Sequence, residues 1–229
     1  MASSNFTWKD YLVQVSLILV SLFIAFGVDR CNQSVRNANR LEAYLEAIGE
    51  ELQMELKASK ANLADCENDI DDMAAATATF ATMNSAKLPE AVGRTGQVIA
   101  RGVFRTFSPM SFQLMNNSGD GLLLEDIELR QQLAAVSAFR ADYIKADLMR
   151  HDELTLTALA DVSNYLDIYC LRDKKPEDHG RCITSLIGLR ENGVSDLIAL
   201  RRHSELRAFH LERYVSLLEH TIPLVEAAQ

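Results

Sequence analysis

The sequence has few of the residues that break helices or build cross-linked scaffolds. Its 229 residues include 10 glycines, 4 prolines and 4 cysteines, and aromatic side chains make up only 7%. Sandwiches and barrels need frequent turns, so the scarcity of glycine and proline argues against both and favours helices. Four cysteines are also too few for a scaffold built from disulfides. The composition therefore predicts an all-α protein of one domain with an appended segment.

Positive charge and catalytic motifs are also scarce. Lysine and arginine number 23 against 32 acidic residues, a net charge of -9, whereas a general nucleic-acid binder needs a basic face. There is no phosphate-binding glycine loop, Gly-x-Ser-x-Gly elbow or zinc signature. His203 and His210 would stand about 10.5 Å apart on a helix, too far to chelate one metal, and we interpret them as core or interface histidines. We therefore expect no enzyme, cofactor, metal site or nucleic-acid partner.

One long hydrophobic run stands out near the N-terminus. Residues 11–28 carry no charge over 18 positions, which on a helix spans about 27 Å, close to the hydrocarbon thickness of a bilayer. Trp8 and Tyr11 lie at one end, where amphipathic rings favour the headgroup level, and Asp29 and Arg30 close the other end. The run predicts a transmembrane helix, with membrane lipid as its partner, after a short tail at residues 1–10.

A cleaved signal peptide is the alternative interpretation of this run. Ala25-Phe26-Gly27 has the small-x-small pattern of a cleavage site. The preceding region, however, carries only Lys9, and Asp10 cancels that charge, whereas a signal peptide begins with a basic region. We therefore favour an uncleaved anchor.

Polar residues interrupt the anchor. The polar side chains of Gln14 and Ser21 would find no hydrogen-bond partner in lipid. We therefore expect both to contact a partner helix within the membrane.

A heptad pattern follows the anchor. No glycine or proline occurs between Glu50 and Leu88, and apolar residues recur at alternating steps of three and four from Leu56 onward. The steps from Ile48 to Leu52 and from Leu52 to Leu56 are both four, which indicates a stutter in the supercoil. We expect one helix from the membrane to about Asn84, with residues 29–84 forming the stalk and first long helix.

The rest of the chain predicts two further long helices. Glycine and proline break residues 85–125 into short pieces, which we expect to form the distal tip. Residues 126–222 would hold a helix that returns to the membrane, a charged hairpin loop on the membrane side, and a last helix that rises again. Pro223 would end that helix and leave a tail at residues 223–229. The expected architecture is an elongated antiparallel bundle of three long helices on a stalk.

Two cysteines flank the charged loop. A disulfide between Cys170 and Cys182 would close a hairpin and contribute about 3 kcal/mol. Free thiols are a second interpretation. A metal site with His179 is a third and the least favoured, since the loop offers three ligands at most and no Cys-x-x-Cys element.

An acidic run lies on the first helix at Asp65, Asp69 and Asp72. It lacks the glycine and the distal glutamate of a calcium loop, so a solvated or salt-bridged face is favoured. Equal rise along the expected bundle would bring arginines of the last helix to the same height. We predict a salt bridge between this run and at least one of them, the candidates being Arg202, Arg207 and Arg213.

Several short segments resemble an uncharacterised family of bacterial single-pass membrane proteins. The segment Gly-Val-Asp-Arg-Cys-Asn-Gln leads from the apolar run into the leucine-rich helix. A later segment combines Ser111-Phe112-Gln113-Leu114, Ser118-Gly119, Leu122-Leu123-Leu124, Glu128-Leu129-Arg130 and Leu133. The resemblance covers the anchor, the first helix and this segment. It implies an N-terminal anchor and a coiled helical ectodomain, and no activity. The chain departs from the family at Arg30-Cys31, where an aromatic residue is usual.

These observations lead to two functional expectations. The first is a non-enzymatic structural or accessory protein that self-associates, or docks on a larger membrane complex, through its helical domain. The second is a ligand-sensing or regulatory periplasmic domain that acts through a partner. We expect the bacterial inner membrane with the large domain in the periplasm, because disulfides form there. The arginines after the anchor, Arg30, Arg36 and Arg40, favour the cytoplasm instead by the positive-inside rule.

Overall fold

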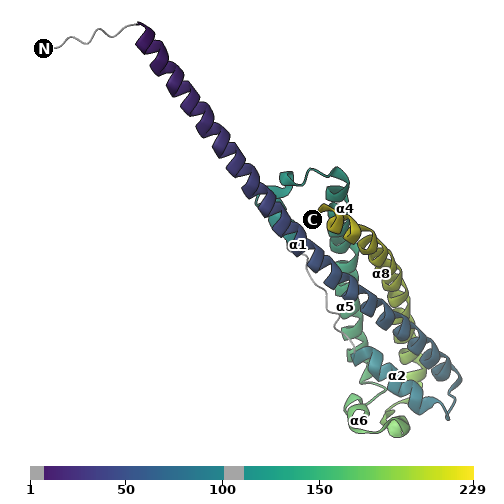
Figure 1. Cartoon of the computed structure of the whole chain (residues 1–229). Coiled ribbons are helices and arrows are strands. Elements are labelled where there is room, and N and C mark those ends of the chain that lie inside the picture. Colours follow the sequence, from purple (N-terminus) through teal and green to yellow (C-terminus); the bar gives the residue numbers. More distant parts are fainter. Residues whose placement is uncertain (1–7, 101–110) are drawn as a thin grey trace.

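The structure, a computed structural model, describes residues 8–100 and 111–229. These residues form helices and turns without a strand, which confirms the all-α class. Most of the expected N-terminal tail, and residues 101–110 of the expected broken region, lie outside the described residues. The longest element is α1 (Trp8–Thr82), which is continuous from the apolar segment to the far end of the bundle (Figure 1).

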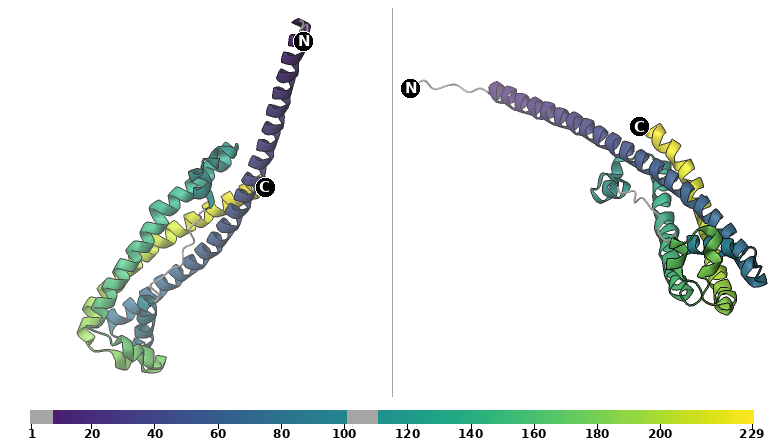
Figure 2. Two further views of the ribbon diagram at one scale, coloured as in Figure 1. Left: turned by 90° about the vertical axis from the view of Figure 1, so that its left-hand side faces the viewer. Right: turned by 90° about the horizontal axis from the view of Figure 1, so that it is seen from below.

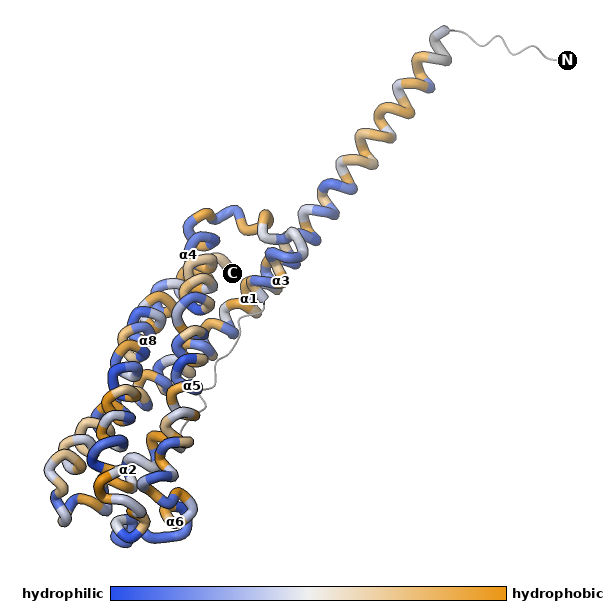
Figure 3. Tube along the Cα trace, turned by 180° about the vertical axis from the view of Figure 1, so that it is seen from behind, coloured by the Kyte–Doolittle hydropathy of each residue, from blue (hydrophilic) through white to orange (hydrophobic). Residues whose placement is uncertain are grey.

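The apolar segment of α1 projects from the bundle alone (Figure 3). Its large side chains are exposed, as Phe23 illustrates with 76% of its surface accessible. It is long and apolar enough to cross a membrane, and none of its most apolar window is buried, which separates it from the core helix of a soluble protein. Below, the end of the bundle next to this segment is the proximal end, and the end around Thr82 is the distal end.

The remaining elements alternate regular helices with short 3₁₀ and π turns. In chain order they are α2 (Leu88–Ala100), α3 (Ser111–Asn117), η1 (Asp120–Leu123), α4 (Ile127–Phe139), η2 (Arg140–Ile144), α5 (Lys145–Val162), α6 (Ile168–Asp173), η3 (Pro176–Cys182), α7 (Leu186–Gly188), η4 (Leu189–Gly193) and α8 (Val194–Ala228). The π turns η2 and η4 join helices that otherwise run straight on, so α4–α5 and α7–α8 act as two continuous rods.

The direction of the last two rods is opposite to the expected one. Lys60 pairs with Glu219 at 2.7 Å and Gln53 bonds Glu226 at 3.0 Å, so α8 runs back along α1 toward the proximal end. Figures 1 and 2 show the C-terminus at that end. The charged loop, η3, packs instead on the start of α2, where a Cβ on Gly180 would meet Pro89 at 3.3 Å. It is therefore distal, and the expectation of a membrane-side loop is wrong.

The segment between the first and second rods explains this reversal. Its two described parts, α2 and residues 111–125, lie at opposite ends of the bundle, so it does not form the compact distal tip that its glycines and prolines predict. Its α2 lies at the distal end, whereas Ser111 donates to Glu51 at 2.8 Å and Asp120 pairs with Arg40 at the proximal end. A segment of this length can span the bundle as well as cap it. The second rod consequently starts at the proximal end and runs parallel to α1.

Two helix boundaries also differ from expectation. The second rod ends at Val162, before Cys170, because Tyr165 leaves the helix and is buried completely in the distal core. Pro223 lies inside α8 and does not end it. Its ring is exposed, so water can reach the carbonyl that lacks an amide partner, while Ile222 and Val225 remain buried against the core.

The core is built in two parts along α1. The proximal part includes Leu45, Ile48, Leu52, Leu129, Leu133, Leu211, Leu218 and Val225. The distal part includes Met73, Phe80, Val92, Val162, Tyr165, Leu189, Leu197 and Leu200. The heptad seam of α1 is therefore occupied by α2, α4 and α8 of the same chain, and it is not a free surface for a coiled coil with a second copy.

Candidate functional site

An open groove lies at the distal end, between the end of α1 and α2. Its volume is about 440 Å³. It is lined by Ala75, Ala78, Thr79, Thr82, Asn84, Lys87, Glu90, Ala91 and Arg94. The side chains of α1 that form its floor are alanine and threonine, so the two helices leave a shallow channel that larger side chains would fill.

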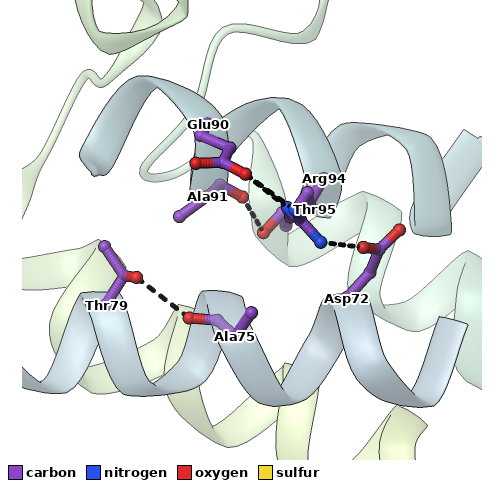
Figure 4. A network of polar contacts seen from close by, with 7 residues as sticks. All are labelled: Asp72, Ala75, Thr79, Glu90, Ala91, Arg94 and Thr95. Atoms are coloured by element: carbon purple, nitrogen blue, oxygen red, sulfur yellow. Dashed lines mark hydrogen bonds and ion pairs between the residues drawn. The ribbon is translucent and has the colours of Figure 1, made fainter. Parts of the chain in front are cut away.

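The polar groups of this groove are held in fixed positions (Figure 4). Arg94 donates to Glu90 on its own helix, with Nη2 2.6 Å from the carboxylate, and also to Asp72 on α1. The Thr79 hydroxyl donates to the backbone oxygen of Ala75 at 2.9 Å. Because these hydroxyl and guanidinium groups are satisfied within the chain, the floor is a small, nearly apolar surface with a charged rim. Such a surface suits the side chains of an amphipathic helix.

The middle of the bundle holds a buried polar layer, which we call the histidine layer and define as Asp147, His151, His203, Arg207 and His210. His210 Nδ1 lies 2.6 Å from the Asp147 carboxylate. His203 Nε2 lies 3.1 Å from the backbone oxygen of Asp147, and its ring stacks on His151 with 6.0 Å between centroids. Only 1% of His151 and 4% of Arg207 are exposed. The layer joins α5 to α8 where a purely apolar core would be expected.

The charges of this layer are shifted by burial. Burial, with Arg207 and His203 nearby, lowers the pKa of His151 to about 3, so this ring is neutral at neutral pH. Burial likewise lowers the pKa of His203. Burial lowers the pKa of Arg207, while Cys66 and Asp69 on α1 act in the opposite direction. Burial raises the pKa of the Cys66 thiol to about 11, which leaves it protonated and inert.

A second buried polar contact lies nearer the proximal end. Arg140, the first residue of the π turn η2, donates through Nε to Glu55 on α1 at 2.9 Å. The Tyr214 hydroxyl of α8 donates to the same carboxylate oxygen at 3.1 Å. Burial raises the pKa of Glu55, and Arg140 and Tyr214 oppose that shift. One residue from each long rod thus meets at this level and fixes how the rods align.

The acidic run and its expected arginines are only partly brought together. Asp69 is buried and interacts electrostatically with Arg207. Asp72 pairs with Arg94 of α2, which the sequence did not indicate. Arg213 stacks its guanidinium over Phe209 at 5.6 Å on the solvent side of α8. Asp65 and Arg202 are both exposed.

The other expected site residues lie at the two ends of the molecule. Cys170 and Cys182 form a disulfide, with 5.5 Å between their Cα atoms, which ties α6 to η3 beside α2. Gln14 is exposed on the projecting segment. The Ser21 hydroxyl donates to the backbone oxygen of Leu17 at 2.8 Å. The contact of Gln14 and Ser21 with a partner helix stays a prediction.

Sequence reasoning missed the histidine layer and the Glu55 contact. A signal was present, because Glu55, Ser59 and Asp69 occupy the same helical face as the apolar seam of α1 and are buried with it. A polar residue at a seam position indicates a buried polar partner on another helix. The partners themselves, Arg140 and Arg207, follow only from the observed directions of the rods.

Within residues 8–100 and 111–229, no group of three or more histidine, cysteine or acidic side chains could hold a metal ion. Comparisons of the chain with protein-family models, curated proteins and solved structures find no match.

Proposed function

We propose that this chain is a non-enzymatic, membrane-anchored accessory protein that docks on a partner through the distal groove. The groove carries this proposal, since its floor of small residues and its charged rim offer a site for the side chains of a helix. Self-association is the same activity with a second copy as partner. The heptad seam supports neither form of docking, because the chain itself covers it.

The rigid construction of the bundle supports this function. α1 continues without interruption from the apolar segment to Thr82, so the groove stands at a fixed distance from the anchor (Figure 1). The Arg140–Glu55 pair and the histidine layer tie the three rods together, which limits bending. A protein that holds a docking surface away from a membrane needs both features.

We place the large domain in the bacterial periplasm as part of the same proposal. The Cys170–Cys182 disulfide supports this side, because disulfides persist in oxidising compartments. An impermeant thiol reagent applied to intact spheroplasts tests it, with a cysteine introduced at Ala61, which is exposed and outside the groove, and with native Cys31 changed to serine. Labelling before lysis supports the periplasm, and labelling only after lysis would place the domain in the cytoplasm.

Capture from native membranes tests the docking function. Ala78→Arg fills the groove without entering the core, because Ala78 is exposed. Ala61→Arg is the matched control, an exposed alanine on the same helix outside the groove. We expect wild type and Ala61→Arg to retain a stoichiometric partner and Ala78→Arg to retain about tenfold less, a loss of about 1.4 kcal/mol. Equal capture by both variants would contradict the proposal.

The histidine layer favours a second candidate, a regulatory domain that acts through a partner. His151, which is buried, and His203, which is half-buried, can take up protons when the bundle loosens, and this couples packing to pH. Partner capture at neutral and mildly acidic pH tests it. Regulation is supported if the amount of captured partner changes with pH in wild type and no longer changes in His151→Gln. Identical capture at both pH values in wild type would exclude it.

A further inference from the structure

The projecting part of α1 carries a heptad pattern that the bundle leaves uncovered (Figure 3). Its members recur at alternating steps of three and four, and we call them the anchor seam: Gln14, Leu17, Ser21, Ile24, Val28, Cys31 and Val35. At about 100° per residue they share an arc of about 100° on the helix. All of them are exposed, and the bundle covers α1 only from Asn37 and Leu41 onward, which are half-buried. The anchor seam therefore ends before the covered heptad seam of the bundle begins.

Charged side chains are kept off the anchor seam. Between positions 11 and 39 the charged residues are Asp29, Arg30 and Arg36, and they fall at heptad positions b and c when Gln14 is position a. The seam itself stays apolar where α1 leaves the apolar run, because Val28 and Val35 are 61% and 59% exposed there. Two identical helices can therefore meet along the seam without placing like charges opposite each other.

The bundle lies on the other side of α1. A groove of about 640 Å³ at the proximal end is lined at the level of the anchor seam by Arg30, Gln33, Ser34 and Asn37. At about 100° per residue these positions centre on the side of the helix opposite the seam. Neither Cys31 nor Val35 lines this groove. Two copies that meet through the anchor seam would consequently carry their bundles outward.

From this arrangement we infer that a second copy of the chain pairs with α1 along the anchor seam, parallel and in register, through the membrane and into the stalk. The inference rests on the proposed membrane anchoring and does not involve the distal groove. Copies of one chain cross a membrane in the same orientation, so identical residues stand at the same height. The Gln14 amide both donates and accepts, so within the bilayer it can bond the Gln14 amide of the partner subunit. A second copy supplies that amide at the required depth.

Disulfide crosslinking in native membranes tests the pairing, because Cys31 is exposed and lies on the seam. Copper phenanthroline with dissolved oxygen oxidises two adjacent thiols to a disulfide. Wild type reports position 31. Three variants that also carry Cys31→Ser report neighbouring exposed positions: Val35→Cys on the seam, and Asp29→Cys and Gln33→Cys off it. We expect severalfold more covalent dimer from positions 31 and 35 than from positions 29 and 33. Equal yields at all four positions, or a maximum at 29 or 33, would overturn the pairing.

Two substitutions in the membrane test the role of the amide. Gln14→Leu should lower the yield of the Cys31 crosslink severalfold, because it removes the hydrogen bond between the copies. Ser16→Leu is the matched control, a polar residue of the same run at heptad position c, and should leave the yield unchanged. An equal effect of the two variants would overturn the assigned role of Gln14.

Two further measurements separate this pairing from the anchor and from the distal groove. Extraction of the chain by alkaline carbonate would overturn the anchor and the pairing together, whereas an anchored chain without the seam pattern would overturn the pairing alone. Ala78→Arg fills the distal groove and should keep the Cys31 crosslink. Loss of the crosslink in Ala78→Arg would show that the groove, and not the anchor seam, holds the copies together.

Discussion

Arg140 and Glu55 form a buried ion pair, with 2.9 Å between Nε and the carboxylate and only 3% of the Glu55 side chain exposed. The pair crosses from the π turn η2 to α1, and Tyr214 of α8 completes it. A π turn holds one more residue per turn than an α-helix and often occurs at functional positions. Here it begins at the residue that carries the ion pair.

Removing one partner of this pair should cost more than removing both. Arg140→Leu leaves the Glu55 carboxylate buried without its cation, and we expect the free energy of unfolding to fall by about 3–5 kcal/mol. Glu55→Leu combined with Arg140→Leu replaces the pair by apolar packing and should recover most of that loss. Chemical denaturation of the two variants measures the difference. If the double variant is no more stable than Arg140→Leu, the pair does not act as a coupled buried unit.

Acid should destabilise the bundle through the histidine layer. The pKa of His151 is lowered from 6.5 to about 3, so between these values the unfolded chain binds a proton that the folded chain does not. The contribution of His151 is therefore complete above pH 6.5 and is lost progressively toward pH 3, with a slope of at most about 1.4 kcal/mol per pH unit. His203, also lowered, acts in the same direction.

The comparison of wild type with His151→Gln isolates this effect. Glu55 and Asp196 have raised pKa values, and their contributions have the opposite sign because the folded state keeps their protons to higher pH. Wild type and His151→Gln share these groups. The difference between their slopes of unfolding free energy against pH, from about pH 6.5 to 5, therefore reports His151 alone. We expect denaturation curves of wild type to depend on pH more steeply than those of His151→Gln. Parallel slopes would mean that His151 is solvated or charged in the folded protein.

The Cys170–Cys182 disulfide should stabilise the distal end. Its sequence separation of 12 predicts a loss of about 3 kcal/mol on removal. We expect Cys170→Ser combined with Cys182→Ser to lower the thermal midpoint, and reducing agent to do the same to wild type but not to the double variant. An equal response of both proteins to reducing agent would show that the bond is not formed.

The close approach of η4 to Tyr165 gives a packing prediction. A Cβ on Gly193 would lie 3.2 Å from the Tyr165 ring, whose hydroxyl donates to Asp196 at 2.8 Å. Gly193→Val would push on a fully buried ring, and we expect a loss of about 1–3 kcal/mol. Gly27→Val, where nothing lies within 4 Å, is the control and should leave stability unchanged in detergent. Similar stability of the two variants would contradict the observed packing.

Local patterns in the sequence predict the helices well. The composition predicts the all-α class, and the uninterrupted heptads of α1 predict its distal end to within two residues, at Thr82 against the expected Asn84. The directions of the other rods could not be predicted, because they depend on whether the glycine-containing segment caps the bundle or runs back along it. Either path satisfies the same periodicity.

The placement of Arg207 shows which contacts depend on the direction of the last helix and which do not. The expected rising helix and the observed descending helix both put Arg207 near Asp69, because the two paths cross at that height. Arg213 also lies at the height of the run on both paths, but it is on the solvent side of α8, over Phe209. The groove between α1 and α2 escaped prediction for a different reason, since alanine and threonine in a helix give no signal until a second helix is placed beside them.

Photo-crosslinking in native membranes tests the central claim most directly. A benzophenone amino acid at position 78 stands in the distal groove, and the same group at position 61 stands on the exposed side of the same helix. We predict one discrete adduct of defined mass from position 78 and none from position 61, with a second copy of the chain or another protein as the crosslinked species. The absence of an adduct at position 78, or the same adduct from both positions, would contradict a docking site in the distal groove.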